Sequence, residues 1–172
     1  MMQIREAVVA DAEALERIRI RGWQIGYRHI FPPAELDALP IEWSRWAESL
    51  RHPQPGHAAF VAETDGRLSG FATTEPACDP ENRLGELRGL YVDPDRWGLG
   101  VGRALLERAE TELGRTWDEA VLWTLADNPR ARRFYESAGW ESDGQTSIFE
   151  RLGVKAPIVH YAKRLSSSTS RS

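Results

Sequence analysis

The sequence contains one cysteine and four histidines, and their scarcity excludes several kinds of site. Cys78 has no partner for an internal disulfide, which is typical of proteins from a reducing compartment. Its acidic neighbours Glu75 and Asp79 favour the neutral thiol, so we expect no reactive thiolate. Because the histidines are not spaced like metal ligands with cysteine or acidic partners, we also expect no metal site.

Long hydrophobic runs and a strong excess of one charge are also absent. No uninterrupted apolar stretch approaches the roughly 20 residues that a membrane helix requires. The first residues lack the basic and apolar regions of a signal peptide. The net charge of -4 provides no general attraction to nucleic acid or to an anionic membrane. We therefore expect a cytoplasmic protein with neither nucleic-acid nor membrane partners.

The length and composition predict one globular domain. The chain has 172 residues, of which 41% are hydrophobic and 28% are charged, as in ordinary globular proteins. We expect residues 1–165 to form the domain and the serine-rich residues 166–172 to be a flexible tail. If the protein is oligomeric, a homodimer is the expected form.

Hydrophobic periodicity predicts a mixed α/β domain. Strand-like runs cover residues 2–8, 57–63, 68–74, 84–92 and 120–126, and residues 140–165 contain two more. Helices are expected after the potential cap Asp11, around residues 43–50, after the glycine run at 98–102, and after Asn128-Pro129. A break is expected at Phe31-Pro32-Pro33. The predicted order is strand, two helices, three strands, helix, strand, helix and two strands.

Two local signals refine this pattern. The Asp65-Gly66 pair lies between two strand-like runs and predicts a hairpin. Gly89 lies inside the run 84–92, where a glycine indicates a bulge or the close approach of another backbone.

The run Gly98-Leu99-Gly100-Val101-Gly102 precedes a predicted helix. A helix begins with unpaired N–H groups, so such a run is either a phosphate cradle or a tight turn without a ligand. A nucleoside-triphosphate loop would continue with Lys and Ser or Thr, but Arg103 and Ala104 follow here. A dinucleotide fingerprint would need a third glycine where Arg103 stands. Spacing therefore excludes both of these nucleotide-binding interpretations.

Two segments resemble the GNAT superfamily of acyl-CoA-dependent N-acetyltransferases. Residues 90–106 resemble that family's strand, pyrophosphate loop and helix, although Trp97 stands where Gln or Arg is usual. Residues 128–140 are similar to the signature Asn-x-x-Ala-x-x-Phe-Tyr-x-x-x-Gly-Phe, with Trp140 as the final aromatic residue. The element order from residue 2 to residue 163 is also similar.

The resemblance implies a GNAT-like fold and an acetyl-CoA cofactor. Its sheet would be central and mostly antiparallel, with six to seven strands, about four flanking helices and a splay at the central parallel pair. The implied reaction transfers the acetyl group directly to a primary amine of a small-molecule acceptor in a ternary complex. Two alternatives remain: a protein N-terminus or lysine acetyltransferase, and a non-catalytic acyl-CoA-binding regulatory domain.

The resemblance also assigns residues to roles. Tyr135 would protonate the departing thiolate, although burial habits alone would make it a core tyrosine. Glu86 would act as the base, directly or through water, with Glu75 and Glu35 as weaker candidates. Backbone N–H groups near Tyr91 or Val92 would polarise the thioester carbonyl. The implied cofactor-binding residues are Leu90, Tyr91, Val92, Arg96, Trp97, Gly98, Leu99, Gly100, Val101, Gly102, Arg103, Asn128, Ala131, Arg132 and Phe134. Family-like placement puts Trp23, Tyr27 and His29 on the acceptor side.

Overall fold

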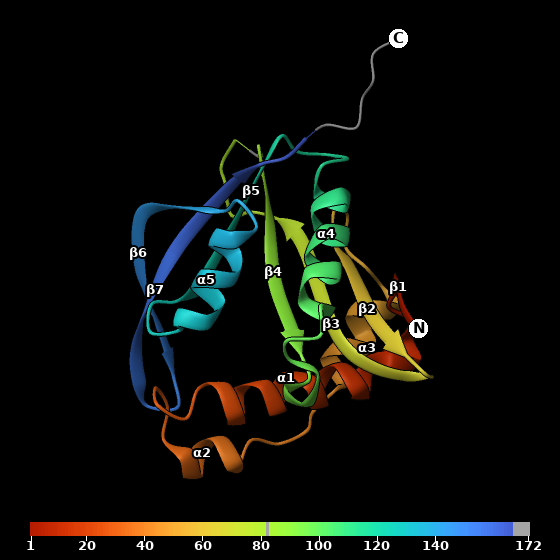
Figure 1. Cartoon of the computed structure of the whole chain (residues 1–172), viewed down its shortest axis with the longest axis vertical. Coiled ribbons are helices and arrows are strands. Elements are labelled where there is room, and N and C mark those ends of the chain that lie inside the picture. Colours follow the sequence, from red (N-terminus) through yellow and green to blue (C-terminus); the bar gives the residue numbers. More distant parts are fainter. Residues whose placement is uncertain (82, 167–172) are drawn as a thin grey trace.

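A single sheet with helices on both faces organises the chain (Figure 1). The computed structural model describes residues 1–81 and 83–166, so the predicted tail lies, apart from Ser166, outside the described residues. The strands in this part are β1 (Met2–Glu6), β2 (Ala58–Thr64), β3 (Arg67–Pro76), β4 (Leu84–Val92), β5 (Glu119–Leu125), β6 (Glu141–Arg151) and β7 (Val154–Arg164). The α-helices are α1 (Ala12–Gly26), α2 (Pro33–Asp37), α3 (Ser44–Arg51), α4 (Val101–Leu113) and α5 (Pro129–Ser137), with short 3-10 turns η1 (Val9–Asp11) and η2 (Pro94–Arg96).

The sheet is splayed at its centre. Its strand order is β1-β2-β3-β4-β5-β7-β6, and the β4–β5 pair is parallel whereas the other described pairs are antiparallel. Pairing of β4 with β5 covers Leu84 to Glu86 opposite Glu119 to Val121. Beyond that point the two strands diverge, as Figure 1 shows. The predicted GNAT-like fold with a splayed parallel pair is confirmed.

The bulge predicted from Gly89 is present in β4. Gly89 pairs with Thr73 of β3, whereas the next pair is Leu87 with Thr74. Arg88 is therefore the extra residue that has no partner of its own. A bulge bends a strand and increases its twist, so it turns the second half of β4 away from β5.

Two details of the first hundred residues differ from the sequence-based expectations. The Phe31-Pro32-Pro33 stretch was expected only to break a helix, but Pro33 begins the short helix α2. Proline fits the first turn of a helix because its missing N–H would have no partner there. At the start of α1, Asp11 holds the cap position but makes no side-chain cap hydrogen bond.

The helices cover the two faces of the sheet through separate apolar clusters. Phe60 and Leu87 face α4, where they pack with Leu105 and Leu106. Successive residues of a strand point to opposite faces of the sheet, and Phe71 of β3 lies on the face away from α4, where it packs against α1. Trp46 of α3 reaches the same ring, with 5.3 Å between the centroids. The core therefore fixes β3 and β4 between α4 on one side and α1 with α3 on the other.

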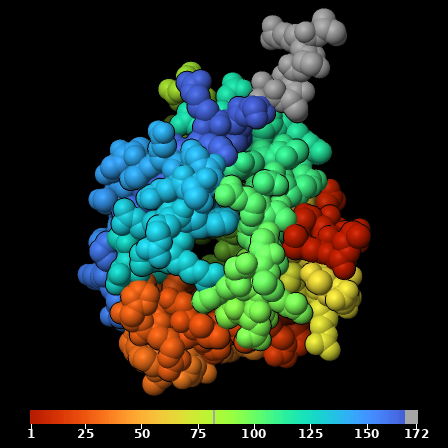
Figure 2. Space-filling view, in the orientation of Figure 1, coloured from red at the N-terminus to blue at the C-terminus, as the bar shows by residue number. Residues whose placement is uncertain are grey.

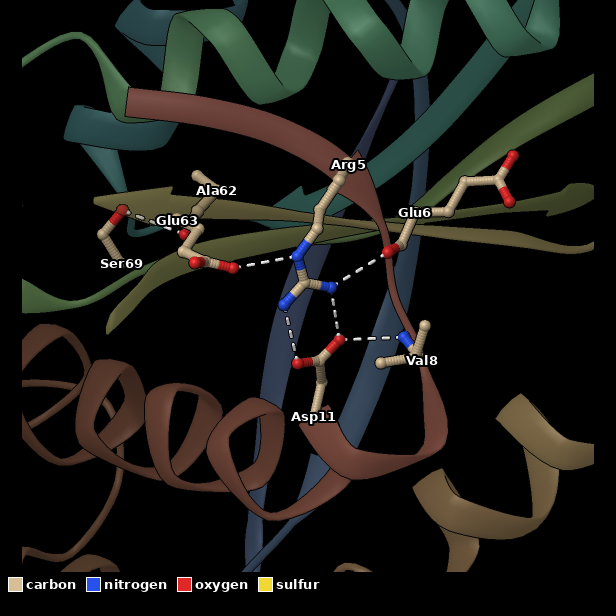
Figure 3. Close-up of polar contacts among 7 residues, drawn as sticks. All are labelled: Arg5, Glu6, Val8, Asp11, Ala62, Glu63 and Ser69. Carbon is tan, nitrogen blue, oxygen red and sulfur yellow. Dashed lines mark hydrogen bonds and ion pairs between the residues drawn. The ribbon is translucent and has the colours of Figure 1, made fainter. Parts of the chain in front are cut away.

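The carboxylate of Asp11 joins β1 to the start of α1 (Figure 3). Arg5 donates two hydrogen bonds to it, at 2.8 and 3.0 Å, and the N–H of Val8 donates a third at 2.8 Å. Arg5 also donates to Glu63 of the neighbouring strand at 2.9 Å. The pKa of Asp11 is lowered, because these hydrogen bonds outweigh the effect of burial, which raises it.

Asp11→Asn is expected to lower the free energy of unfolding by about 2 kcal/mol, since hydrogen bonds to charged groups contribute roughly that much. Urea denaturation of the purified protein measures the change. Asp95→Asn is the matched control, because its carboxylate is 76% exposed and its contact with Arg21 is 3.3 Å long. Exposed pairs contribute little, so this control should keep wild-type stability. Equal midpoints for the two variants would contradict a structural role for Asp11.

No helix within residues 1–81 and 83–166 is long and apolar enough to cross a membrane. The same residues contain no group of three or more His, Cys, Asp or Glu side chains placed to hold a metal ion. Cys78 is exposed and is not part of a disulfide.

Candidate active site

A cavity of about 750 Å³ opens where β4 and β5 diverge. Figure 2 shows the hollow between the green segment that leads from β4 into α4, the cyan α5 and the orange N-terminal helices. Its lining comes from the end of α1, the second half of β4, the glycine run with the start of α4, and the start of α5. Segments far apart in the sequence thus meet at the splay.

The glycine run forms the N-terminus of α4. Gly98 and Gly100 have φ angles of +78° and +83°, a left-handed conformation that favours glycine. The first intrahelical bond is donated by the N–H of Ala104 to the carbonyl of Gly100, at 3.1 Å. The N–H groups of the preceding residues, Val101 to Arg103, lie at the positive end of the helix dipole. This end of the cavity therefore suits a phosphate group.

Trp97, the departure from the family pattern, has a defined place in this loop. Its Nε1–H donates to the carbonyl of Val92 at 2.9 Å, which fastens the loop to the end of β4. The guanidinium of Arg130 lies over its ring, 3.6 Å from the centroid. Trp97 thereby connects the glycine loop with the first turn of α5, on the other side of the splay. A Gln or Arg side chain would offer no indole face for Arg130.

The free edge of β4 presents a backbone donor to the cavity. The N–H of Asp93 donates to the carbonyl of Ser69 on β3, at 2.8 Å. Backbone N–H groups of a strand alternate between its two edges, so the N–H of Tyr91 also points to β3. The N–H groups of Leu90 and Val92 therefore point to the other edge, from which β5 has diverged. Of the two residues expected to donate, Tyr91 thus faces away, and Leu90 joins Val92 at the open edge.

Helix α5 brings Asn128 and Tyr135 to the cavity. The Asn128 side chain accepts the N–H of Ala131 at 3.2 Å, which confirms the predicted cap. Tyr135 is 9% exposed and lines the cavity. Within the described residues its hydroxyl makes no hydrogen bond, so the O–H is available to a bound molecule. Burial raises the pKa of Tyr135 well above its ordinary value, which keeps the phenol protonated.

Glu86 lies at the point where β4 and β5 separate, and it is not among the residues that line the cavity. It is the last β4 residue that pairs with β5, opposite Val121, and it is 9% exposed. The neighbouring Gly85 faces Leu113 and Trp117, so Glu86 lies on the sheet face away from α4. Burial raises the pKa of Glu86, and the charge of Glu75 adds to this while Arg88 and His160 oppose it.

The remaining predicted site residues fall into two groups. On the lining are Tyr27, His29, Leu90, Tyr91, Val92, Arg96, Trp97, Gly98, Gly100, Val101, Gly102, Arg103, Asn128, Ala131 and Phe134. Three lie off it: Leu99 is 64% exposed, Trp23 is buried in the core, and Arg132 donates to the Tyr161 hydroxyl and the Ala126 carbonyl.

Sequence reasoning missed Arg130 and Asp127, which both line the cavity. The carbonyl of Asp127 lies 2.7 Å from Nε2 of His29, and this contact ties the end of α1 to the β5–α5 loop. No motif marked either residue. Arg130 falls at a variable position of the Asn-x-x-Ala signature, and its role depends on Trp97, 33 residues away in the sequence but adjacent in space.

Comparison with known proteins gives one consistent result. Residues 18–140 match the acetyltransferase (GNAT) family. A protein of Archaeoglobus fulgidus named as an N-acetyltransferase is 41% identical over 145 residues, which cover 79% of this chain and 90% of that protein. A mycothiol acetyltransferase of Acidothermus cellulolyticus is 39% identical over 108 residues, which cover 55% of this chain and 33% of its own length.

The fold is also found among solved structures. The structure of yncA, a putative acetyltransferase of Salmonella typhimurium with its cofactor acetyl-CoA, aligns with a TM-score of 0.75. The two chains are 22% identical, and the alignment covers 99% of this chain and 98% of that one.

Proposed function

Because the chain belongs to the acetyltransferase (GNAT) family, we propose that it transfers the acetyl group of acetyl-CoA to a primary amine of a small molecule. The observation that carries this proposal is the cavity at the splay. There a helix N-terminus, a free strand edge and a protonated tyrosine converge from α4, β4 and α5. These are the three groups that a thioester donor with a pyrophosphate requires.

The residues present fit such a donor. The N–H groups of Val101, Gly102 and Arg103 would hold the pyrophosphate, and Arg96 and Arg103 stand at the same end of the cavity to add charge. The N–H groups of Leu90 and Val92 would donate hydrogen bonds to carbonyl oxygens of acetyl-CoA along the edge of β4 that β5 leaves open. When bound, acetyl-CoA supplies an activated acyl group and a thiolate leaving group.

The chain's own groups then serve the transfer. The free edge N–H of β4 would stabilise the developing oxyanion, and one such donor lowers a barrier by roughly 3 kcal/mol. Tyr135 would give its proton to the departing sulfur. Glu86 would take the proton of the acceptor ammonium, because burial raises its pKa toward the range in which a carboxylate is a useful base.

A small acceptor is favoured over a protein by a contact that joins two walls of the cavity. Nε2 of His29 lies 2.7 Å from the carbonyl of Asp127, and both residues line the cavity. The likeness to a mycothiol acetyltransferase, whose acceptor is a small molecule by name, supports the same choice.

The test is release of free thiol from acetyl-CoA in the presence of a panel of primary amines and of peptides with free N-termini or lysines. We expect turnover with one or more small amines, and turnover at least about tenfold slower with every peptide. Turnover with peptides alone would instead support a protein acetyltransferase. Tight binding of acetyl-CoA without turnover of any acceptor would support a non-catalytic binding domain.

A further inference from the structure

Three arginines line the cavity, and they come from two of its walls. Arg96 and Arg103 flank the glycine run, whereas Arg130 lies in the first turn of α5. In the described part of the chain, the ion pairs between arginines and carboxylates involve none of the three. Asp127 is the one acid among the described lining residues, and its carboxylate lies 3.7 Å from Nε2 of His29. In a chain with a net charge of -4, this local excess of positive charge favours an anionic ligand.

The guanidinium of Arg130 lies against the indole ring of Trp97. Its central carbon is 3.6 Å from the ring centroid, well inside the distance at which a cation and an aromatic ring attract each other. At this distance the flat guanidinium stacks on the ring with its face. Its N–H groups lie at the rim of that plane, and none of them donates a hydrogen bond to another described residue. Arg130 therefore has a defined place and unused donors.

The ring of Trp97 is itself held by two other elements. Its Nε1–H donates to the carbonyl of Val92 at the end of β4, as described above. The far end of the ring lies beside Gly26, the last residue of α1, where an added Cβ would be 3.7 Å from Cη2 of the indole. An arginine at position 97, one of the two usual residues in the family pattern, would repel Arg130 instead of holding it. Trp97 therefore sets the position of the Arg130 guanidinium.

This stack brings Arg130 to the end of the cavity that suits a phosphate. Trp97 directly precedes the glycine run, and the N–H groups of Val101 to Arg103 begin α4 on the same lining. The N–H groups of a helix N-terminus offer an anion partial charges only. A guanidinium adds a full charge and parallel N–H donors that match the spacing of phosphate oxygens. Arg130 therefore complements the N-terminus of α4 from a second helix.

We propose that Arg130, positioned by Trp97, binds the pyrophosphate of acetyl-CoA from the α5 side of the cavity. The inference rests on the acetyl-CoA donor of the proposed function, but not on its acceptor. Each phosphoryl group of the pyrophosphate is negatively charged, and here groups from α4 and α5 would hold them together. The bound donor would thus link the two helices on either side of the splay. Trp97 acts through Arg130 and is a positioning residue.

The test compares the Kd of three donors that differ in their phosphates, for the wild type and Arg130→Met. Acetyl-CoA and acetyl-dephospho-CoA, which lacks only the 3′-phosphate, are measured by calorimetry. S-acetylpantetheine, which lacks the pyrophosphate as well, is measured by its displacement of acetyl-CoA. Methionine keeps an unbranched stem and removes the N–H donors. We expect the Kd of both pyrophosphate donors to rise by about tenfold or more, as for hydrogen bonds between charged groups, and that of S-acetylpantetheine to be unchanged.

Three results would overturn this assignment. A loss of affinity confined to acetyl-CoA would place Arg130 at the 3′-phosphate instead. An equal loss for all three donors would show a damaged cavity, and no loss for any donor would exclude Arg130 from binding. Arg133→Met is the matched control, because it removes the same charge from an exposed position of α5 that is not among the described lining residues. It should keep the wild-type Kd for each donor.

A double-mutant cycle tests the positioning role of Trp97. Trp97→Gln should also weaken the binding of acetyl-CoA, by about fivefold or more, because the guanidinium loses its support. Adding Arg130→Met to this variant should then cost about twofold or less, since residues that act as a unit are not additive. Effects that multiply would overturn the positioning role. These measurements need no turnover, so a wild-type protein that binds acetyl-CoA but acetylates no amine would overturn the proposed function and leave this inference standing.

Discussion

Replacement of Tyr135 by phenylalanine is expected to lower kcat by about 100-fold, within the range that general acid catalysis ordinarily contributes. The change removes one oxygen and leaves the ring, which packs between Phe134 and Trp140 at centroid distances of 5.2 and 6.2 Å. The cavity should therefore keep its shape, and the affinity for acetyl-CoA should be unchanged. The effect is predicted to appear in kcat rather than in KM.

The pH dependence follows from the protonation of this tyrosine. Burial raises the pKa of Tyr135 above the ordinary tyrosine pKa near ~10. The phenol therefore keeps the proton that it donates at every pH below that ordinary pKa, and also at pH values somewhat above it. The group therefore contributes no loss of activity on the acid side or across the neutral range. The Tyr135→Phe variant should show a lower rate with an unchanged pH profile between pH 6 and pH 9.

Tyr161→Phe is the matched control for this prediction. Its hydroxyl is bound to Arg132 and Glu136 below α5, outside the cavity lining, and the side chain is fully buried. It should retain wild-type kcat even though a hydrogen-bonded hydroxyl is lost. Equal kcat for Tyr135→Phe and the wild type, measured by thiol release under saturating acetyl-CoA, would remove Tyr135 from the mechanism.

The largest effect on stability is expected at Trp140. This residue is 1% exposed and packs in the cluster beneath α4 and α5. Its Nε1–H donates to Glu110 of α4 at 2.9 Å, and Lys163 of β7 donates to the same carboxylate at 3.0 Å. Trp140→Ala empties a large volume that the surrounding helices cannot fill. We expect the free energy of unfolding to fall by about 4 kcal/mol.

Two further tryptophan variants serve as comparisons for Trp140→Ala. Trp140→Phe keeps an aromatic ring, as the family signature has it, but removes the donor to Glu110. It should therefore cost much less than the alanine substitution, since Lys163 still pairs with that carboxylate. Trp43→Ala changes a residue that is 41% exposed, and its effect should be small. Urea denaturation should show the largest loss of stability for Trp140→Ala, a smaller loss for Trp140→Phe and the smallest for Trp43→Ala. A Trp140→Ala variant as stable as Trp140→Phe would refute the packing argument.

Much of the fold was determined by local sequence. The Asp65-Gly66 turn, the Asn128 cap with Pro129, and the glycines that open α4 each depend on interactions within a few residues of themselves. Strand alternation and helical periodicity then specified the order of elements. Gly89 indicated the bulge for the same reason, because an interior glycine weakens a strand whatever surrounds it.

Local patterns also identified the residues of the glycine loop and of α5 as one site, through their resemblance to a family. They could not say which backbone N–H groups face the splay. That depends on which edge of β4 is paired with β3. They also gave no reason for Trp97, whose indole ring is contacted by the guanidinium of Arg130 from α5.

Only the tertiary structure decided which charged groups lie together. Asp11 was expected to cap its own helix, but Arg5 from the adjacent strand takes its carboxylate. Asp143 and His160 attracted no attention as separate residues, and a bulge in β6 brings them into contact. Ion pairing and hydrogen bonding act over a few ångströms in space, whereas sequence patterns report spacing along the chain. The backbone course was therefore largely readable from the sequence, and the partners of its charged side chains were not.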